Sequence, residues 1–282
     1  MVSLNVICSE LARMAPLRLA ESWDNVGLLV GNRQQSISRA MTCLTITPNV
    51  VDEAIDEKVD LVIAHHPLPF KSLQKITSDT IPGAMLLRLM GSSTAIYSAH
   101  TAFDSAADGI NQMWAESLDL QSVGPLVLQE PTASPSSTAE TSAESNIAAA
   151  SLDGAGRVGK LVEPMLLDDL VRRLAADVGA TAPRRVGSAD QLVTKVAFAC
   201  GSGGSFLAAA KRVGCDALIT GEATFHTCLE AESMGIALGL LGHYWSERFA
   251  MEKLAARLSE AVPELTIWPS RSEHDPIENV NL

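Results

Sequence analysis

The stretch Asp60-Leu61-Val62-Ile63-Ala64-His65-His66-Pro67 decides how the rest of the chain is interpreted. Its apolar run is short and rich in β-branched residues, which is typical of a buried strand. Strands buried on both faces occur in parallel α/β sheets, where ligands bind beyond the carboxyl ends of the strands. Neighbouring side chains of a strand point in opposite directions, so His65 and His66 could serve two different metal ions. By itself, a His-His pair is also found as two loop histidines with ordinary hydrogen-bond partners.

The length and composition describe a globular protein with a sizeable core. The chain has 282 residues, of which 47% are hydrophobic and 19% charged, enough for one large domain or two modest ones. No apolar run reaches the roughly 20 residues of a membrane helix. Residues 1–15 lack a basic start and carry Glu10 and Arg13 within their apolar pattern, so no signal peptide is expected. We therefore expect a cytoplasmic protein.

Net charge and cysteine usage argue against several classes of protein. A net charge of −12 repels a phosphate backbone, and no basic patch offsets it, so nucleic-acid binding is not expected. The cysteines are odd in number and widely spaced, without a Cys-x-x-Cys pair. This argues against a disulfide framework and a structural zinc ribbon. They are Cys8, Cys43, Cys200, Cys215 and Cys228.

The order of the predicted elements indicates two α/β halves. In the first half, an opening helix precedes a right-handed unit of strand, helix and strand that ends in the two histidines. In the second half strands and helices alternate again, and a last helix and strand close the chain. Helices are predicted at 4–14, 48–58, 81–90, 106–118, 166–178, 205–213, 226–234 and 247–261, and strands at 40–47, 61–66, 94–98, 192–200, 216–220, 236–241 and 265–268.

The composition changes abruptly between Gln129 and Ala150, where Ser, Thr, Ala, Pro and Glu dominate. Such a segment has little apolar surface to bury and cannot offset its ordering entropy, so a disordered linker or surface insert is expected. The chain is therefore predicted to divide into four parts. These are a first α/β half at 1–124, the low-complexity linker at 125–156, a second α/β half at 157–246, and a C-terminal helix and strand at 247–282 that return to the first half.

The two halves repeat one plan of side chains at their strand ends. The stretch 60–66 is echoed by 216–222, and the following strand in each half ends in a histidine with a carboxylate four residues later. This spacing puts two side chains on one face of a helix. If the halves pack about an approximate two-fold axis, these groups meet between them. They are His65, His66, His100, His243, Asp104, Glu222 and Glu247.

This set of imidazoles and carboxylates indicates a metal site. Without thiolates it suits Zn, Mn, Fe or Co and does not choose among them. The arrangement that fits is two divalent ions about 3.5–4 Å apart that share a carboxylate and a bridging water, which supplies hydroxide near neutral pH. The loop Gly201-Ser202-Gly203-Gly204 has two interpretations. It is either a backbone nest for an anion such as phosphate or only a tight turn from strand to helix.

Six motifs occur together along the chain, outside the segment 129–150. They are Trp23-Asp24-Asn25-Val26-Gly27, His65-His66-Pro67, Ser98-Ala99-His100-Thr101-Ala102-Phe103-Asp104, Cys200-Gly201-Ser202-Gly203, Gly221-Glu222 with His226, and Gly242-His243-Tyr244 with Glu247. In this combination and order the chain resembles the GTP cyclohydrolase I type 2-like proteins. That family is also called the Nif-three-like dinuclear metal centre proteins.

The resemblance implies a fold, a site and an assembly. The fold would be two interlinked α/β domains with mixed sheets and a dinuclear metal site in the cleft between them, assembled as a ring-shaped homohexamer. The implied metal ligands are His65, His66, Asp104, His243 and Glu247, with Glu247 as the bridge. The residues that match nearby positions, and would support the ligands or act in acid–base catalysis, are His100, Glu222 and His226.

Three functions are compatible with these observations. The first is a hydrolase with two divalent metal ions that opens the imidazole ring of a GTP-like purine nucleotide, with a bridging hydroxide attacking C8. The second is a phosphoester hydrolase whose glycine loop holds phosphate. The third is a metal-binding or assembly protein without turnover, since ligands alone do not establish catalysis. In the first two, the expected partner is a small-molecule substrate.

Overall fold

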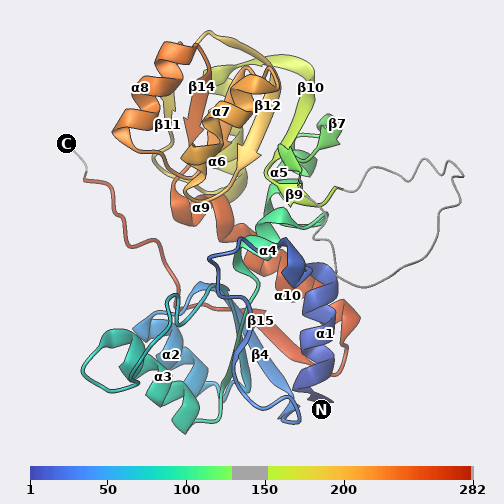
Figure 1. The fold of residues 1–282 in the computed structure, drawn as a ribbon, viewed down its shortest axis with the longest axis vertical. Coiled ribbons are helices and arrows are strands. Elements are labelled where there is room, and N and C mark those ends of the chain that lie inside the picture. Colours follow the sequence, from blue (N-terminus) through green and yellow to red (C-terminus); the bar gives the residue numbers. More distant parts are fainter. Residues whose placement is uncertain (129–151, 281–282) are drawn as a thin grey trace, which may run out of the picture.

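Two β-sheets organise the chain, of which the computed structural model describes residues 1–128 and 152–280. The low-complexity segment at 129–150 therefore lies outside the described residues, and of the linker predicted at 125–156 only residues 125–128 and 152–156 are described. The first sheet, in the lower half of Figure 1, has the strand order β15-β4-β5-β6-β2. Its first four strands are parallel and β2 is antiparallel to β6, which confirms the predicted mixed α/β fold. The strands are β2 (Gly27–Val30), β4 (Arg39–Thr45), β5 (Leu61–His66), β6 (Ala95–Ser98) and β15 (Thr266–Pro269).

The side chains of β5 alternate between two hydrophobic cores. Leu61 and Ile63 share one core with α1 and α10, while Val62 and Ala64 share the other with α2 and α3. Figure 1 shows the sheet edge-on, with α2 and α3 on one side and α1 and α10 on the other. A strand buried on both faces carries apolar residues along its whole length, so polar side chains begin only at its carboxyl end, at His65. The helices are α1 (Leu4–Met14), α2 (Pro48–Asp56), α3 (Ile81–Gly91) and α10 (Phe249–Ala261).

The second sheet has the order β11-β14-β13-β12-β10-β7, with β12, β13 and β14 parallel and antiparallel strands on both sides. Its parallel strands confirm those predicted at 192–200, 216–220 and 236–241. The long strand β10 escaped prediction because exposed residues such as Lys160 and Glu163 interrupt its apolar pattern. The strands are β7 (Gln121–Gly124), β10 (Arg157–Leu166), β11 (Arg184–Val186), β12 (Leu192–Ala199), β13 (Ala217–Thr220) and β14 (Ala237–Leu240).

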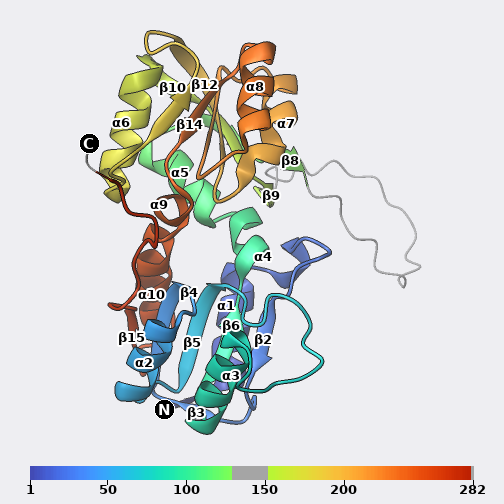
Figure 2. The same cartoon turned by 90° about the vertical axis from the view of Figure 1, so that its left-hand side faces the viewer.

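Helix α6 covers one face of the second sheet, and α7 and α8 cover the other (Figure 2). The single helix predicted at 106–118 is wrong at its start, because the chain turns between α4 and α5. At Gly109 a Cβ would stand 1.8 Å from the carbonyl oxygen of Phe103, so the backbone needs a glycine there. The helices are α4 (His100–Ser105), α5 (Ile110–Ser117), α6 (Leu167–Val178), α7 (Leu207–Arg212), α8 (Phe225–Met234) and α9 (His243–Glu247).

The remaining described elements are short. Two pairs of strands form small separate sheets, β1 with β3 and β8 with β9, and two 3₁₀ turns precede β2 and α7. None of the helices in the described ranges is both long enough and apolar enough to cross a membrane. The bounds are β1 (Val2–Ser3), β3 (Ser36–Ile37), β8 (Val127–Leu128), β9 (Gly154–Ala155), η1 (Leu17–Leu19) and η2 (Gly203–Phe206).

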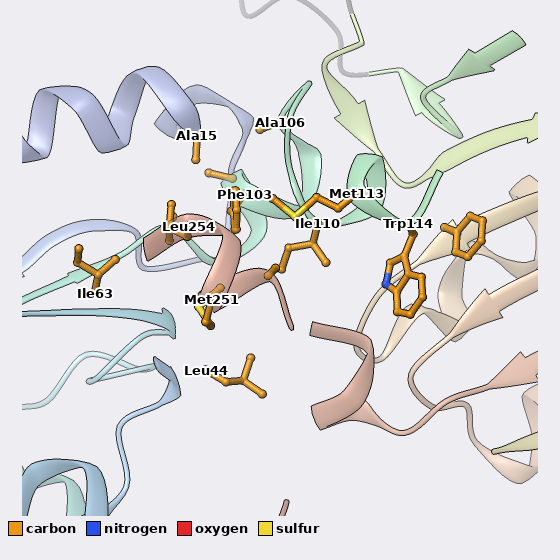
Figure 3. Packing of buried hydrophobic residues seen from close by; sticks show 14 of the residues in the cluster. Ala15, Leu44, Ile63, Phe103, Ala106, Ile110, Met113, Trp114, Met251 and Leu254 are labelled. Carbon is orange, nitrogen blue, oxygen red and sulfur yellow. The ribbon is translucent and has the colours of Figure 1, made fainter. Parts of the chain in front are cut away.

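One hydrophobic core joins the two sheets (Figure 3). Helices α4, α5 and α10 lie between the sheets and supply its middle section. The ring of Trp114 on α5 stacks on Phe198 of the second sheet, with centroids 5.9 Å apart, and meets Phe249 of α10 at 4.8 Å. Because well-packed interiors deform little, this core fixes where the strand ends of one sheet lie relative to those of the other.

Candidate metal centre

Four histidines from three strand ends meet between the two sheets. His65 and His66 end β5, His100 begins α4 directly after β6, and His243 begins α9 after β14. Ring centroids are 5.1 Å apart for His65 and His66, 5.2 Å for His65 and His100, and 5.3 Å for His66 and His243. Neighbouring side chains of a flat strand point in opposite directions, but the rings of His65 and His66 lie close together. They nevertheless contact different partners. We call His65, His66, His100 and His243, with Asp104 and Glu247, the histidine–carboxylate cluster.

Glu247 lies at the middle of this cluster. Its side chain is 4% exposed, and its Oε2 lies 3.1 Å from Nε2 of His66 and 3.2 Å from Nε2 of His243. Its other oxygen, Oε1, lies 3.9 Å from Nε2 of His65, which in turn lies 3.5 Å from Oδ1 of Asp104. Both carboxylates follow a histidine by four residues on a helix, as the predicted spacing requires.

The ligand atoms form two triads that share Glu247. One consists of His65, Asp104 and Glu247 and the other of His66, His243 and Glu247, with the atoms of each triad within 4.8 Å of one another. A third group of the same compactness, His65, His66 and His100, overlaps both. Two triads with one common carboxylate are the arrangement expected of a site for two ions.

The chemistry of these residues fits divalent cations. Both ring nitrogens of His65 are buried without a hydrogen-bond partner, which is costly in an interior unless a ligand is bound there. The Nε2 atoms of His66 and His243 face each other at 3.4 Å beside the Glu247 carboxylate. Two imidazole nitrogens and a carboxylate converging on one point require a proton or a cation between them. Imidazole and carboxylate together suit Zn, Mn, Fe or Co.

Without cations, protons compensate the charge of the cluster. Burial and the neighbouring Glu247 carboxylate raise the pKa of Asp104 to about 7. The hydrogen bond to Glu247 raises the pKa of His243 to about 9. Burial would raise the pKa of Glu247, but hydrogen bonds from His243 and His66 outweigh it and keep this pKa well below its ordinary value. A cation bound here would therefore displace protons from His243 and Asp104.

Each of the three partly exposed histidines has a partner on its outer ring nitrogen. Nδ1 of His66 lies 2.7 Å from Thr45 Oγ1, and Nδ1 of His243 lies 3.0 Å from Glu222 Oε1. Nδ1 of His100 lies 2.7 Å from Asp24 Oδ1. Since a carboxylate only accepts, Glu222 and Asp24 bind an Nδ1–H and leave Nε2 free to face the cluster. Such partners orient metal-binding histidines and set their tautomer.

Sequence reasoning missed the role of Asp24. Its side chain is fully buried and also accepts a hydrogen bond from the backbone N–H of Thr101, at 3.1 Å. Burial opposes ionisation, but hydrogen bonds from His100 and Thr101 lower the pKa of Asp24 to about 2. Asp24 belongs to the motif at 23–27, yet no local pattern links that motif to His100, which is 76 positions away.

The other two predicted acid–base residues lie in different surroundings. Glu222 contacts the cluster, but through its hydrogen bond to His243, and Ser202 Oγ donates to the same oxygen at 2.6 Å. His226 is exposed on α8, and its ring meets that of Phe225. Within the described residues, the structure does not bring His226 to the histidine–carboxylate cluster.

The glycine loop at 201–204 packs closely against the cluster. At Gly201, where φ is +59°, a Cβ would stand 2.2 Å from Oε1 of Glu247. The backbone N–H of Gly201 donates to Ser246 Oγ and that of Gly203 to Thr220 Oγ1, both at 2.9 Å. Two of the four N–H groups are thus already bound, which favours the tight-turn interpretation over a phosphate nest.

A cavity of about 570 Å³ opens beside the cluster. His66, His100, Asp104, His243 and Glu247 all line it. Its walls come from both sheets, so it is formed only where the two meet. A cavity of this size accommodates a small molecule.

Taken together, the fold and site define an α/β protein whose facing strand ends hold a partly buried histidine–carboxylate cluster. The family model Duf34/NIF3 (NGG1p interacting factor 3) matches residues 2–276, and the chain belongs to this family. This confirms the resemblance that the motifs indicated.

Individual proteins of known sequence or structure are similar to this chain as well. The chain is 30% identical to a "GTP cyclohydrolase 1 type 2 homolog" of Clostridium perfringens, over 98% of this chain and 99% of the relative. It is 31% identical to a "GTP cyclohydrolase 1 type 2" of Helicobacter pylori, over 84% of each. A solved Bacillus cereus protein related to NIF3 shares the fold, with a TM-score of 0.85, 24% identity and 99% of both chains covered.

Proposed function

We propose that this chain binds two divalent metal ions in the cleft between its two sheets and hydrolyses a small nucleotide-like substrate. The observation that carries the proposal is the pair of triads that share Glu247. One ion would be held by His65, Asp104 and Glu247, and the other by His66, His243 and Glu247. The ring-shaped homohexamer implied by the motif resemblance belongs to the same proposal, and light scattering would test it.

Ions bound there would polarise a substrate oxygen and lower the pKa of a bound water. The chain's own residues would orient the ligands and move protons. Thr45 and Glu222 hold His66 and His243 with Nε2 facing inward. His100 lines the cavity, and because its Nδ1–H donates to Asp24, its Nε2 is the atom that would accept and release a proton.

The names of the relatives favour ring opening as the reaction. Hydrolytic opening of a purine imidazole ring adds water at a carbon and breaks a carbon–nitrogen bond. One proton must leave the water and another must reach the departing nitrogen. His100 would serve both transfers. Burial opposes its protonation, but the hydrogen bond to Asp24 raises the pKa of His100 overall, so it can hold a proton for the leaving nitrogen.

The other two functions have less support. A phosphoester hydrolase would gain from free N–H groups in the glycine loop, yet Gly201 and Gly203 donate theirs within the protein. A metal-binding protein without turnover needs no substrate space, whereas a cavity of about 570 Å³ adjoins the cluster. A cavity at this point gives a substrate access to the cluster, which supports the proposal of an enzyme.

Metal content tests the proposal directly. Protein purified without chelator should contain two divalent ions per chain by elemental analysis. Glu247→Gln should contain fewer than one, because the shared carboxylate contributes to both sites. Glu230→Gln, which alters an exposed glutamate of α8, is the matched control and should keep both. If Glu247→Gln also keeps both ions, Glu247 is not shared.

Turnover is tested on the same samples. GTP, simple nucleotides and a generic phosphodiester would be offered to protein loaded with Zn, Mn, Fe or Co. His100→Ala should keep both ions but slow any hydrolysis by about a hundredfold, the usual scale for losing a general acid or base. If none of these compounds is hydrolysed by protein loaded with any of the metals, the proposed hydrolase activity is refuted and only metal binding remains.

A further inference from the structure

The segment that follows β15 joins the first sheet to the second half of the molecule. It leaves the first sheet beside α2, where the Glu53 carboxylate accepts hydrogen bonds from the backbone N–H groups of Arg271 and Ser272, at 3.1 and 2.9 Å. Figure 2 shows the segment running from there toward the second sheet. Near its end, Nδ2 of Asn279 donates to Thr181 Oγ1 at 2.9 Å. The segment is thus attached to both halves.

Between these attachments the side chain of Glu273 is buried, with 2% of it exposed. The strand β15 pairs with β4 only as far as Pro269, opposite Thr42. Beyond that point the Glu273 carboxylate accepts hydrogen bonds from the backbone N–H groups of Leu44, at 3.0 Å, and Thr45, at 2.6 Å. A side chain of the C-terminal segment therefore takes the place of a strand at the end of β4.

Glu273 also contacts the residues that follow two of the proposed metal ligands. Nε of Arg248, which follows Glu247, lies 2.7 Å from Oε2 of Glu273. Because the side chain of Arg248 is only 11% exposed, water and salt screen this ion pair little. The hydroxyl group of Tyr244, which follows His243, lies 3.5 Å from the backbone carbonyl oxygen of Glu273. Both contacts lie on or directly beside α9, the helix that carries His243 and Glu247.

These contacts converge on one of the two proposed ion sites. Thr45 Oγ1 lies 2.7 Å from Nδ1 of His66, so the residue whose backbone Glu273 binds is also the residue that orients this ring. One buried carboxylate thus contacts a residue that binds or follows each member of one triad. We call this the second triad, and its members are His66, His243 and Glu247.

We infer that Glu273 is a positioning residue for the second triad and fixes the geometry in which this triad binds its ion. The end of β4 carries Thr45 and α9 carries the other two ligands, so the carboxylate sets His66 against them. Among the described residues, Glu273 forms no hydrogen bond or ion pair with His65 or Asp104, which belong to the other ion alone. The inference rests on the proposed function, because it concerns one of the two proposed ions.

Zinc titration tests whether Glu273 acts on one ion. Metal-free parent, Glu273→Gln and Glu264→Gln, which alters an exposed glutamate, would be titrated with Zn²⁺ against a chromogenic chelator. Glu273→Gln removes the charge that Arg248 faces and turns an N–H group toward one of the two backbone donors. One of the two binding constants should therefore weaken about tenfold or more, the usual effect of losing a partner of a metal ligand, while the other stays unchanged. The control should match the parent.

A purely structural role for Glu273 would give a different result. Loss of a buried ion pair lowers stability in either case, so the binding constants of folded protein, checked by circular dichroism, decide. Two unchanged constants, or two that weaken alike, would overturn the inference. Glu273→Asp keeps the charge but is shorter, and it should weaken the same constant to a smaller extent. If Glu273→Gln does not fold, Glu273→Asp decides by the same criteria.

Thr45 provides a second measurement. Thr45→Val removes the oxygen that binds His66 and should weaken the same constant as Glu273→Gln, again by about tenfold. Because Glu273 acts on His66 through Thr45, adding Glu273→Gln to Thr45→Val should weaken binding less than the same change does in the parent. Equal losses in the two backgrounds would show that Glu273 and Thr45 act independently, and would overturn the inference.

The titration of the parent separates this inference from the proposed function. Fewer than two bound Zn²⁺ ions per parent chain would refute the proposed function. Two ions in the parent, with binding constants that Glu273→Gln leaves unchanged, would refute only the role of Glu273.

Discussion

Replacing Gly201 by alanine should empty the proposed metal site, although the residue itself offers no ligand atom. A Cβ at this position would stand 2.2 Å from Oε1 of Glu247 and 3.2 Å from its Cδ. The first distance is more than 1 Å below the 3.4 Å at which ordinary contact begins. The carboxylate or the loop must therefore move by a distance that metal coordination, which tolerates about 0.2 Å, does not allow.

The clash can be separated from backbone strain. Gly201 has φ +59°, where a residue with a Cβ costs about 1–2 kcal/mol. Gly235 has φ +63°, and no described heavy atom beyond its chain neighbours lies within 4 Å of a Cβ built there. Gly235→Ala should therefore show the strain alone, a fall in melting temperature of about 2–8 °C with both ions retained. The melting temperature of Gly201→Ala should fall at least as far, and this variant should hold less than one ion per chain.

Elemental analysis and thermal denaturation of the two variants, purified side by side without chelator, make the comparison. The reasoning is refuted if Gly201→Ala retains both ions, because the crowding of Glu247 would then have no consequence for coordination. It is also refuted if Gly235→Ala loses its metals to the same degree, since backbone strain alone would then explain the loss.

Two further predictions concern stability. Asp24→Asn should lower the free energy of unfolding by about 2 kcal/mol at pH 7, because a pKa lowered from 3.8 to about 2 stabilises the folded state. This contribution is present above pH 3.8 and is lost as the pH falls to 2, so urea unfolding of parent and variant should converge there; a gap independent of pH would contradict it. Arg157→Met should cost about 3–5 kcal/mol, because the buried guanidinium donates to the carbonyl oxygens of Gly154, Gly156 and Ala106, which methionine leaves unpaired. Urea unfolding that shows a loss below about 1 kcal/mol would disprove the importance of these bonds.

Much of the local structure could be read from the sequence. The apolar run before His65 predicts a strand buried on both faces, because only apolar residues suit both cores. The four-residue spacing of His243 and Glu247 predicts a shared helix face, and their Nε2 and Oε2 atoms lie 3.2 Å apart. In both cases the signal is contained in a few neighbouring residues, whose pattern reflects burial or helical period.

Other features of the site left no local signal. Glu222 was predicted either to support a metal ligand or to move protons, and its hydrogen bonds with His243 and Ser202 fit the supporting role. His226 follows a strand end as the cluster histidines do, but α8 leaves it exposed. The glycine loop was compatible with a phosphate nest or a tight turn, and its hydrogen bonds to Ser246 and Thr220 favour the turn. Each outcome depends on how the segments that follow different strands of the second sheet pack against one another.

The sequence by itself determined that strands end in histidines and carboxylates, and in which order those residues follow along the chain. Only the tertiary structure decided which nitrogen of each ring faces inward, because Asp24 and Thr45 come from other segments than the histidines they bind. Both contacts join segments beside neighbouring strands of the first sheet, β4 with β5 and β2 with β6, and the hydrophobic core around Trp114 then sets this sheet against the second. This core is formed by residues that lie far apart in the sequence, so no local sequence pattern predicts it.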